Sequence, residues 1–413
     1  MQVNIDSITK ASGNINGVVK HTPCVFNENL SLKTGGRVYL KREDLQDIRS
    51  YKIRGAFNLI SMLDEEQQKK GVVCSSAGNH AQGVAFACKK MGIKGTIFMP
   101  VTTPQQKVKK TKKFGESFVD VRLIGDTFDD ACKESFKFAD ETGAVYVHRF
   151  NDPRIFSGQG TIAYEAFEQL PKIDYIIVPV GGGGLISGIG SYTKSFSPET
   201  KIIAVEPEGA ASLTLALEKG KPEELTEITK FIDGASVKRI GDVSFDIAKD
   251  VVDQVITVPD GSVCSTIMEL FNNDGIVAEP AGAMSIAALS HVDIDFKDKN
   301  VLCILSGGNN DWGRLSVIEE KSLLYEGLKH YLIVDFPQRP GALREFLDEV
   351  LGPTDDIVRF EYLKKTNREF GPALVGLSVN KAEDFDEIQK KLREHGITYF
   401  DVKNDKRLFE YLI

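Results

Sequence analysis

The stretch DYIIVPVGGGGLISGIGSY, residues 174–192, decides the fold of this chain. Its first seven residues are almost entirely apolar, which is typical of a strand buried on both faces in a parallel sheet. Four glycines, Gly181, Gly182, Gly183 and Gly184, follow directly and lead into a helical pattern. Successive glycines let several backbone N–H groups point at one anion where a helix begins. The stretch therefore predicts a strand, a phosphate-binding turn and a helix.

This stretch could also be interpreted as a dinucleotide-binding turn or as a membrane-spanning helix. A dinucleotide-binding turn is disfavoured because GGGGLISG does not follow the spacing G-x-G-x-x-G. Glu206 nevertheless follows Gly184 at about the distance expected of a ribose-binding acid, so spacing alone leaves this alternative open. A membrane-spanning helix is disfavoured because glycines and Pro179 interrupt the uncharged run and would destabilise a helix throughout.

Similar strands and helices flank this stretch from about residue 36 to residue 306. Further strand candidates are RVYLK (37–41), GVVCSS (71–76), GTIFMP (95–100), KIIAVEP (201–207) and NVLCILS (300–306). Amphipathic helical patterns such as NHAQGVAFACKKM (79–91) lie between them. This alternation predicts an α/β fold of open, mostly parallel sheets with covering helices. We expect two subdomains, of which the smaller spans about residues 50–150.

The pattern changes after Trp312. A charged helical linker, RLSVIEEKSLLYEG (314–327), precedes segments in the order βαββαβ, whose second strand candidate is DIVRFEYLKK (356–365). That order is typical of a ferredoxin-like sheet with two helices on one face. We therefore expect a main body over residues 1–325 and a second domain over residues 326–413.

Composition excludes several classes of protein. The 413-residue chain is 42% hydrophobic, which suits a globular protein with buried cores. Its net charge of −8 argues against nucleic acid or an anionic membrane as a partner, because both attract basic surfaces. No basic segment followed by an apolar stretch begins the chain, so we expect a cytoplasmic protein. The six cysteines form no C-x-x-C pair, so neither a disulfide framework nor a zinc site is expected.

A second motif, SYKIRGA (50–56), places Lys52 near the start of a predicted helix. A lysine amine in a dry pocket can react with a carbonyl group, and a glycine close by lets a planar ligand approach. On this heptapeptide alone, a solvated surface lysine is an equally good interpretation.

A third motif, SSAGNHAQG (75–83), lies where a buried strand turns into a helix. Free N–H groups and the positive end of the helix dipole can hold a carboxylate there. Ser76 can donate to that carboxylate, and Asn79 can donate to a phenolate-like oxygen. Alternatively, Ser76 or Asn79 only caps the helix. The His80 ring can either contact a ligand or pack in the core, and we favour packing in the core.

A fourth motif, SGGN (306–309), ends the last strand of the main body. The hydroxyl of Ser306 can lie against a ring nitrogen of a ligand bound beside that strand. All four motifs fall at the carboxyl ends of strands, which is the edge where open α/β sheets bind ligands.

Together, the four motifs resemble those of the pyridoxal-phosphate enzymes of the tryptophan-synthase β-like fold (fold type II), specifically the threonine dehydratases or threonine ammonia-lyases. SYKIRGA is similar to the family's cofactor-lysine motif, SSAGNHAQG to its substrate-carboxylate loop, GGGGL to its phosphate loop and LSGGN to its pyridine-nitrogen site. The resemblance covers essentially the whole chain. It implies conversion of L-threonine to 2-oxobutanoate and ammonia, the first step of isoleucine biosynthesis, with pyridoxal 5′-phosphate as cofactor.

The resemblance implies a role for each motif. Lys52 is the implied catalytic residue and covalent cofactor ligand, Asn79 contacts the cofactor's 3′-oxygen, Gly181 to Gly184 hold its phosphate and Ser306 meets its ring nitrogen. The implied substrate-binding residues are Ser76, Ala77, Gly78, Asn79 and His80. A neutral serine beside the ring nitrogen would not keep the ring protonated, which favours elimination over transamination.

Three further features of the sequence refine the resemblance. Related serine racemases have a second serine where this chain has Ala77, so we expect poor racemisation. Some relatives bind a divalent cation through positions matched by Glu206 and Ala210, but the third position is Ser212, so no tight metal site is expected. Glu279, in AEPAGA, either lines the pocket or caps the helix that it precedes.

The C-terminal βαββαβ segment resembles the ACT-like regulatory domain of biosynthetic threonine dehydratases, most clearly in PQRPGAL (337–343). The implied effector is isoleucine, with valine as a candidate opposing effector, and the family suggests a homotetramer. Larger relatives carry two such units and this chain carries one, which leaves the sign and strength of regulation open. The alternative is an assembly module that binds nothing.

The sequence disfavours three other functions. A catabolic threonine or serine dehydratase is disfavoured because feedback belongs to synthesis. A β-replacement enzyme such as a cysteine synthase is disfavoured because SYKIRGA and SSAGNHAQG are closer to the dehydratases. A non-catalytic amino-acid sensor is disfavoured because the chain retains Lys52.

Overall fold

The computed structural model of the protein describes residues 3–362 and 369–412. The chain forms two compact units, Met1–Trp312 and Gly313–Ile413. In the described ranges, no helix has both the length and the apolar character needed to cross a bilayer. Each unit has its own hydrophobic core.

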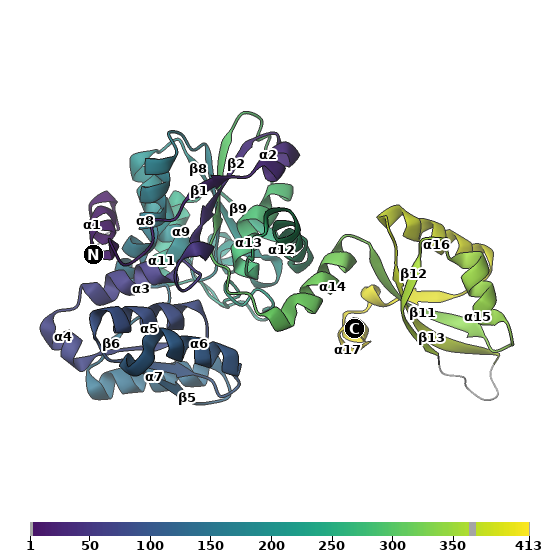
Figure 1. The fold of residues 1–413 in the computed structure, drawn as a ribbon, viewed down its shortest axis with the longest axis horizontal. Helices are drawn as coiled ribbons and strands as arrows, with labels where there is room; N and C mark the ends of the chain where they lie inside the picture. The colour runs from purple at the N-terminus through teal and green to yellow at the C-terminus, as the bar shows by residue number, and fades with distance from the viewer. Residues whose placement is uncertain (1–2, 363–368, 413) are drawn as a thin grey trace. The chain divides into compact units, whose positions relative to one another are not determined.

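The larger sheet of the first unit has six strands in the order β1-β2-β10-β7-β8-β9. Of these strands, β1, β2, β8 and β9 are labelled in Figure 1. Only the pair β1 and β2 is antiparallel. Ile176 packs with residues of α8 and α9, whereas its neighbour Ile177 points to the other face, on the side of α13. The strands are β1 (Cys24–Phe26), β2 (Arg37–Arg42), β7 (Tyr175–Pro179), β8 (Lys201–Pro207), β9 (Gln254–Val258) and β10 (Asn300–Leu305).

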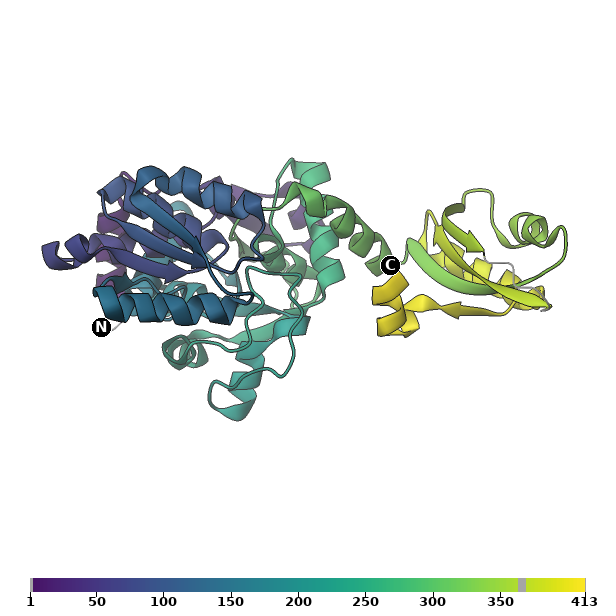
Figure 2. The same cartoon turned by 90° about the horizontal axis from the view of Figure 1, so that it is seen from below.

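The smaller sheet of this unit is fully parallel, in the order β5-β4-β3-β6. Val72 and Cys74 pack in the core below α3 and α5, whereas Val73 packs against α7, so helices cover both faces (Figure 2). The strands are β3 (Val72–Ser75), β4 (Gly95–Met99), β5 (Val119–Leu123) and β6 (Val145–Tyr146). The predicted α/β fold of open, mostly parallel sheets is confirmed, because all six strand candidates of the body form strands.

The helices of the first unit connect these strands. They are α1 (Ile5–Ile15), α2 (Glu28–Thr34), α3 (Lys52–Ser61), α4 (Glu65–Lys70), α5 (Asn79–Met91), α6 (Gln105–Gly115), α7 (Phe128–Thr142), α8 (Pro153–Gln169), α9 (Gly184–Phe196), α10 (Ser212–Lys219), α11 (Asp242–Val251), α12 (Asp260–Asp274) and α13 (Pro280–Ala287). Among these, α3, α5 and α9 begin at three of the four sequence motifs that predicted a site, and α13 begins directly after Glu279.

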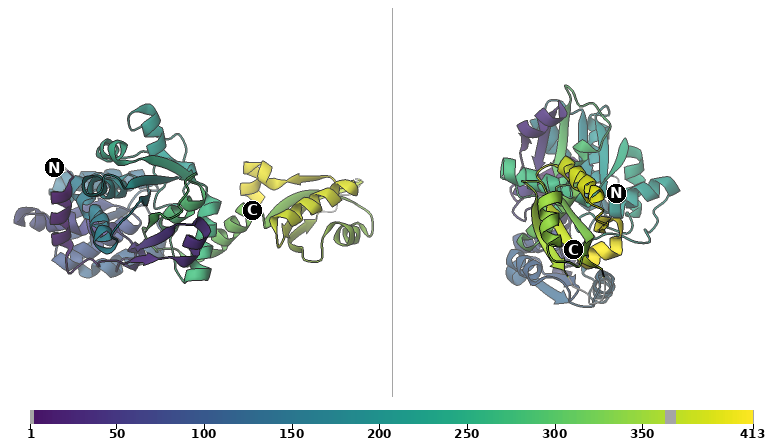
Figure 3. Two further views of the ribbon diagram at one scale, coloured as in Figure 1. Left: turned by 90° about the horizontal axis from the view of Figure 1, so that it is seen from above. Right: turned by 90° about the vertical axis from the view of Figure 1, so that its right-hand side faces the viewer.

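The second unit, drawn in green to yellow in Figure 3, contains an antiparallel sheet in the order β12-β13-β11-β14. Its helices α15 and α16 pack on one face, and α17 packs on the other. The βαββαβ order is confirmed, although residues 363–365 of the second predicted strand lie outside the described residues. The elements are β11 (Lys329–Pro337), α15 (Ala342–Glu345) with a π-helical turn (Phe346–Val350), β12 (Asp356–Tyr362), β13 (Phe370–Ser378), α16 (Ala382–Glu394), β14 (Tyr399–Asp401) and α17 (Lys406–Leu412).

The second unit starts earlier than the boundary expected near residue 326, because it includes α14 (Leu315–Tyr325). Glu320 on this helix accepts a hydrogen bond from the Tyr331 hydroxyl at 2.6 Å and forms an ion pair with Lys329. The predicted helical linker is therefore tied to β11.

Candidate active site

The lysine motif and the serine motif lie side by side. The backbone N–H of Tyr51 donates to the carbonyl of Ser306 at 3.1 Å, and Ser50 forms a β-bridge with Gly307. Lys52 is the first residue of α3, immediately after this bridge. The carboxyl end of β10 thus positions the start of the helix that carries the lysine.

Lys52 is half-buried, and a backbone carbonyl connects its amine to the segment that packs on the glycine turn. Its Nζ donates to the carbonyl of Arg149 at 3.4 Å. The next residue, Phe150, packs against the turn so closely that a Cβ atom on Gly182 would lie 2.3 Å from its ring. The sequence analysis did not identify Phe150 as a site residue. Its one indication in the sequence is its position shortly after the short strand β6.

The glycine turn has the geometry of an anion site. Gly183 has φ +89°, a left-handed conformation that glycine adopts without strain, and it precedes α9. No side chain among the described residues caps this helix, so its first N–H groups are open to a ligand.

Two unpaired hydroxyls next to this turn strengthen the fit to a phosphate. Among the described residues, the buried hydroxyls of Ser236 and Ser244 have no hydrogen-bond partner. A Cβ atom on Gly183 would lie 2.6 Å from that of Ser244, and one on Gly181 would lie 2.8 Å from the carbonyl of Ala235. Unpaired donors beside free N–H groups suit the phosphate group of pyridoxal phosphate.

The SSAGN loop leads from β3 into α5, which begins at Asn79 without a side-chain cap among the described residues. The hydroxyl oxygen of Ser76 accepts a hydrogen bond from the N–H of Gly78 at 3.2 Å and keeps its own proton for a ligand. Ala77 and Gly78 are partly exposed. The loop therefore presents backbone N–H groups and one hydroxyl at the sheet edge.

The His80 ring is buried in the core. Its Nε2 lies 2.9 Å from the carbonyl of Val147, and burial, together with the charge of Lys52, lowers the pKa of His80 to about 3. The ring is neutral at physiological pH, so only the backbone N–H of His80 is available to a substrate carboxylate.

Glu279 connects two of the motifs. Asn79 donates from Nδ2 to Glu279 at 2.7 Å and accepts from the amide of Asn309 at 2.8 Å. The N–H of Asn309 donates to the same carboxylate at 3.2 Å, and a Cβ on Gly307 would lie 2.3 Å from it. Glu279 therefore orients Asn79, and its side chain makes no cap for α13. Nearby Ser306 donates to the carbonyl of Ala281 at 3.3 Å.

Burial raises the pKa of Glu279 to about 7, and the negative charge of Asp233 acts in the same direction. The hydrogen bonds from Asn79 and Asn309 and the charge of Lys107 oppose this shift. Glu279 is thus the carboxyl of the candidate site that changes charge near neutral pH. Sequence reasoning left its role open, because pocket lining and helix capping give the same local pattern.

A buried ionic network lies behind the lysine. Arg54, two residues after Lys52, is fully buried and donates to Glu43 at 2.8 Å and to Glu165 at 2.6 Å. Lys41 also donates to Glu165, at 2.7 Å. The two cations and two carboxylates balance in charge and join α3 to β2 and α8.

Glu206, which matches a metal-ligand position of some relatives, accepts hydrogen bonds from the N–H groups of Leu213 at 2.6 Å and Thr214 at 2.8 Å. It therefore stabilises the start of α10. In the described part of the chain, no group of three or more His, Cys, Asp or Glu side chains could hold a metal ion.

Comparisons with known proteins agree with this geometry. Residues 15–307 match the family model "Pyridoxal-phosphate dependent enzyme", and residues 320–412 match "C-terminal regulatory domain of Threonine dehydratase". A relative named "L-threonine dehydratase biosynthetic IlvA" from Bacillus subtilis (strain 168) is 50% identical over 412 residues, covering 100% of this chain and 98% of the relative. The relative of the same name from Staphylococcus aureus (strain NCTC 8325 / PS 47) is 47% identical over 416 residues, covering 100% and 99%.

Solved structures share the fold of the first unit. The processed form of threonine deaminase isoform 2 from Solanum lycopersicum superposes with a TM-score of 0.72 at 36% identity, covering 78% of this chain and 96% of that one. Maize serine racemase superposes with a TM-score of 0.73 at 34% identity, covering 79% and 99%. The fold alone therefore does not separate dehydratase from racemase, but the full-length relatives and the regulatory-domain match do. This chain belongs to the pyridoxal-phosphate dependent enzymes and, within them, to the biosynthetic threonine dehydratases.

Proposed function

We propose that this protein converts L-threonine to 2-oxobutanoate and ammonia as the first step of isoleucine biosynthesis, under feedback control by isoleucine. The observation that carries the proposal is the 50% identity to a biosynthetic threonine dehydratase over the whole chain, including the regulatory domain. We assign catalysis to the first unit and regulation to the second. The proposal includes a cytoplasmic homotetramer, with valine as an opposing effector.

The residues present would hold the cofactor at the edge where the motifs meet. Lys52 would bind it covalently, the N–H groups of Gly181 to Gly184 would hold its phosphate, and Asn79 and Ser306 would contact its 3′-oxygen and ring nitrogen. When bound, pyridoxal phosphate withdraws electrons from the α-carbon of an amino acid and so acidifies the α-C–H.

The chain's own groups would perform the proton transfers. Backbone N–H groups of Ala77 to His80 and the Ser76 hydroxyl bind the threonine carboxylate at the start of α5. Once threonine has displaced Lys52 from the cofactor, the freed amine would remove the α-proton, and the β-hydroxyl would leave as water with a proton supplied near the phosphate. Water then replaces the nitrogen, so that one threonine yields one 2-oxobutanoate and one ammonia.

Two features of the site favour elimination over transamination and racemisation. Ser306 is neutral and buried, and its hydroxyl donates to a backbone carbonyl, so this residue supplies no carboxylate that would keep a ring nitrogen protonated. Ala77 carries no hydroxyl to act as a second acid or base. Both features support dehydration as the main reaction rather than transamination or racemisation.

The test combines absorbance and turnover. Lys52→Ala is expected to abolish the visible absorbance of the bound cofactor and to reduce threonine turnover more than a thousandfold, because the covalent anchor and the base are lost together. Lys137→Ala, at an exposed position on α7, is the matched control and should retain both. Cofactor absorbance retained in Lys52→Ala would contradict the assignment.

A steady-state assay with threonine or serine, with and without isoleucine, tests the regulation. Isoleucine should inhibit threonine turnover. If isoleucine leaves threonine turnover unchanged, the assignment as a dehydratase stands but feedback by isoleucine is contradicted. That result would favour a catabolic dehydratase.

A further inference from the structure

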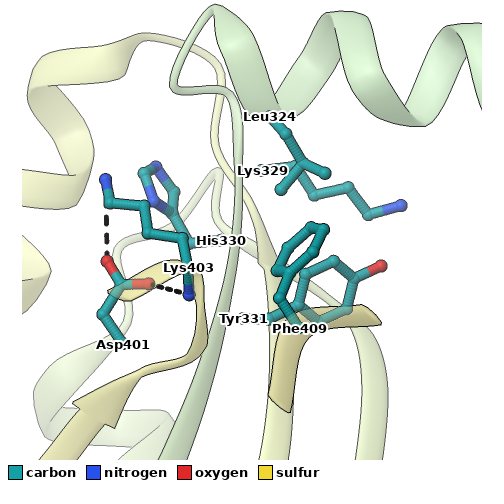
Figure 4. Close-up of a pocket in the computed structure, with 7 residues that line it drawn as sticks. All are labelled: Leu324, Lys329, His330, Tyr331, Asp401, Lys403 and Phe409. Carbon is teal, nitrogen blue, oxygen red and sulfur yellow. Dashed lines mark hydrogen bonds and ion pairs between the residues drawn. The ribbon is translucent and has the colours of Figure 1, made fainter. Parts of the chain in front are cut away.

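Lys110, on α6, lies outside the four motifs and contacts the candidate active site. Its Nζ donates to the side-chain oxygen of Asn309 at 2.9 Å. By contrast, Lys403 in the second unit forms an ion pair with Asp401, drawn as a dashed line in Figure 4. Lys110 is half-buried, and burial, together with the charge of Arg49, lowers its pKa. The Lys110 amine therefore binds a neutral amide, whose orientation it can influence.

The side-chain amide of Asn309 is fixed from both sides. Its Oδ1 accepts from Lys110, and its Nδ2 donates to the carbonyl of Ile48 at 2.6 Å and to Oδ1 of Asn79 at 2.8 Å. A charged lysine can only donate, and a backbone carbonyl can only accept. Rotating the amide by half a turn would place its N–H groups against the ammonium and its oxygen against the carbonyl. Asn309 therefore presents an N–H, and not an oxygen, to Asn79.

The side-chain amide of Asn79 is fixed in the same way. Its Oδ1 accepts from Asn309, and its Nδ2 faces both oxygens of Glu279, at 2.7 and 3.0 Å. The two oxygens of one carboxylate subtend a smaller angle at this nitrogen than its two N–H bonds do, so one N–H points at Glu279. The described residues provide no other acceptor for this nitrogen. The second N–H of Asn79 is therefore available to a ligand.

Burial makes this order of donors and acceptors costly to change. Glu279 is 7% exposed, and its carboxylate also accepts the backbone N–H of Asn309 at 3.2 Å. A Cβ atom on Gly307 would lie 2.3 Å from the same carboxylate, so the backbone packs closely against it. A buried polar group that loses its partner costs more free energy than an exposed one, because water does not replace the partner. The carboxylate is therefore held facing the two asparagines.

We propose that Lys110 and Glu279 are positioning residues that act through these two amides on the cofactor's 3′-oxygen. A side chain that only donates at one end and a side chain that only accepts at the other fix the direction of the hydrogen bonds between them, so Asn79 offers the 3′-oxygen an N–H. A hydrogen bond donated to an ionised oxygen favours the ionised form. This inference rests on the proposed function, in which Asn79 contacts that oxygen.

The absorbance of the full-length holoenzyme without substrate tests the proposal. An ionised phenolic oxygen absorbs at longer wavelength than a protonated one, so the ratio of the two bands reports the charge of the 3′-oxygen. Measurement at pH 8 keeps Glu279 ionised, because its pKa is about 7. Lys110→Met and Glu279→Gln should each lower the ratio of long-wavelength to short-wavelength absorbance about threefold and weaken cofactor binding, because each releases one end of the hydrogen-bonded chain.

The two substitutions separate orientation from charge. Lys110→Met removes a positive charge and Glu279→Gln removes a negative one, so a direct effect of charge on the 3′-oxygen would move the ratio in opposite directions. Lost orientation of Asn79 moves it in the same direction. Lys110→Arg keeps a side chain that only donates and should retain the wild-type ratio. The matched control is Lys109→Met, at an exposed position on the same helix, which should also retain it.

The outcomes also separate this proposal from the proposed function. A wild-type ratio in both Lys110→Met and Glu279→Gln, or a higher ratio in Glu279→Gln, would overturn the positioning roles. Lys110 is only half-buried, so Lys110→Met should fold even if Glu279→Gln does not, and a wild-type ratio in Lys110→Met would then overturn the proposal by itself. A wild-type chain without visible cofactor absorbance would instead contradict the proposed function.

Discussion

Asn79 donates from Nδ2 to both carboxylate oxygens of Glu279, at 2.7 and 3.0 Å, although 200 residues separate the two in the chain. Asn79 begins α5, next to the smaller sheet, and Glu279 directly precedes α13, which packs on the larger sheet. The contact therefore joins the two parts of the first unit at the candidate active site. Because Glu279 is buried, its charge matters for both stability and pH dependence.

Glu279→Gln should change how stability depends on pH. The pKa of Glu279 rises from 4.5 to about 7 in the folded chain, mainly through burial. Between these values the unfolded chain has released a proton that the folded chain keeps, so the free energy of unfolding falls as pH rises, by about 3 kcal/mol in total. Glutamine has no such proton, so chemical denaturation between pH 4.5 and 8 should show this fall only in the wild type.

The control for this experiment is Glu28→Gln, at an exposed position on α2. It should leave the pH dependence of unfolding unchanged. An identical pH dependence in the wild type and Glu279→Gln would show that Glu279 is ionised throughout this range.

Arg54→Met should strongly destabilise the first unit. The substitution leaves Glu43 and Glu165 buried with only Lys41 to compensate their charges. Breaking a buried ion pair from one side costs about 3–5 kcal/mol. Urea denaturation of Arg54→Met measures the loss directly.

Arg122→Met is the matched control, because Arg122 forms an exposed pair with Asp120 at 2.7 Å. Exposed ion pairs contribute about 0–1 kcal/mol, so this variant should remain close to the wild type. Similar losses in the two arginine variants would mean that the buried network contributes no more than a surface pair.

Gly183→Ala should impair cofactor binding as well as stability. An alanine at φ +89° is strained by about 1–2 kcal/mol, and its Cβ would also meet Ser244 beside the turn. We expect affinity for pyridoxal phosphate to fall more than tenfold, measured by titration of the cofactor absorbance.

Gly220→Ala separates backbone strain from the effect on the turn. Gly220 has φ +70° at the end of α10, and a Cβ there would meet nothing within 4 Å. This variant should lose only the stability that backbone strain costs, about 1–2 kcal/mol, and should bind the cofactor like the wild type. Normal cofactor affinity in Gly183→Ala would argue against the glycine turn as the phosphate site.

His80→Gln should reduce the loss of stability in acid. The pKa of His80 falls from 6.5 to about 3 on folding, so between these values the unfolded chain binds a proton that the folded chain does not. The free energy of unfolding then falls by about 2 kcal/mol between pH 7 and pH 5 through this residue alone. Glutamine can still donate to the Val147 carbonyl and does not titrate, so the difference between wild type and variant in denaturation curves isolates this contribution. A constant difference across this range would contradict the assignment of the ring to the core.

Much of the fold could be predicted from the sequence because its signals are local. The run 174–180 is apolar on both faces, and the glycines after it allow conformations that other residues avoid, so a buried strand and an anion turn follow from neighbouring residues alone. Likewise, the spacing of apolar residues after Trp312 predicts the βαββαβ order. The start of α3 at Lys52 also follows from a local pattern.

Only the tertiary structure decided which side chains meet. The pairing of Asn79 with Glu279, the packing of Phe150 on Gly182 and the burial of Arg54 each depend on residues far apart in the chain. A local pattern carries no information about such partners, because a side chain's contacts depend on how the sheets and helices pack. The sequence by itself determined the order of the elements and the residue types at the sheet edge. The packing of the two sheets determined the geometry of the site, because hydrogen bonds and buried charges require partners at fixed distances.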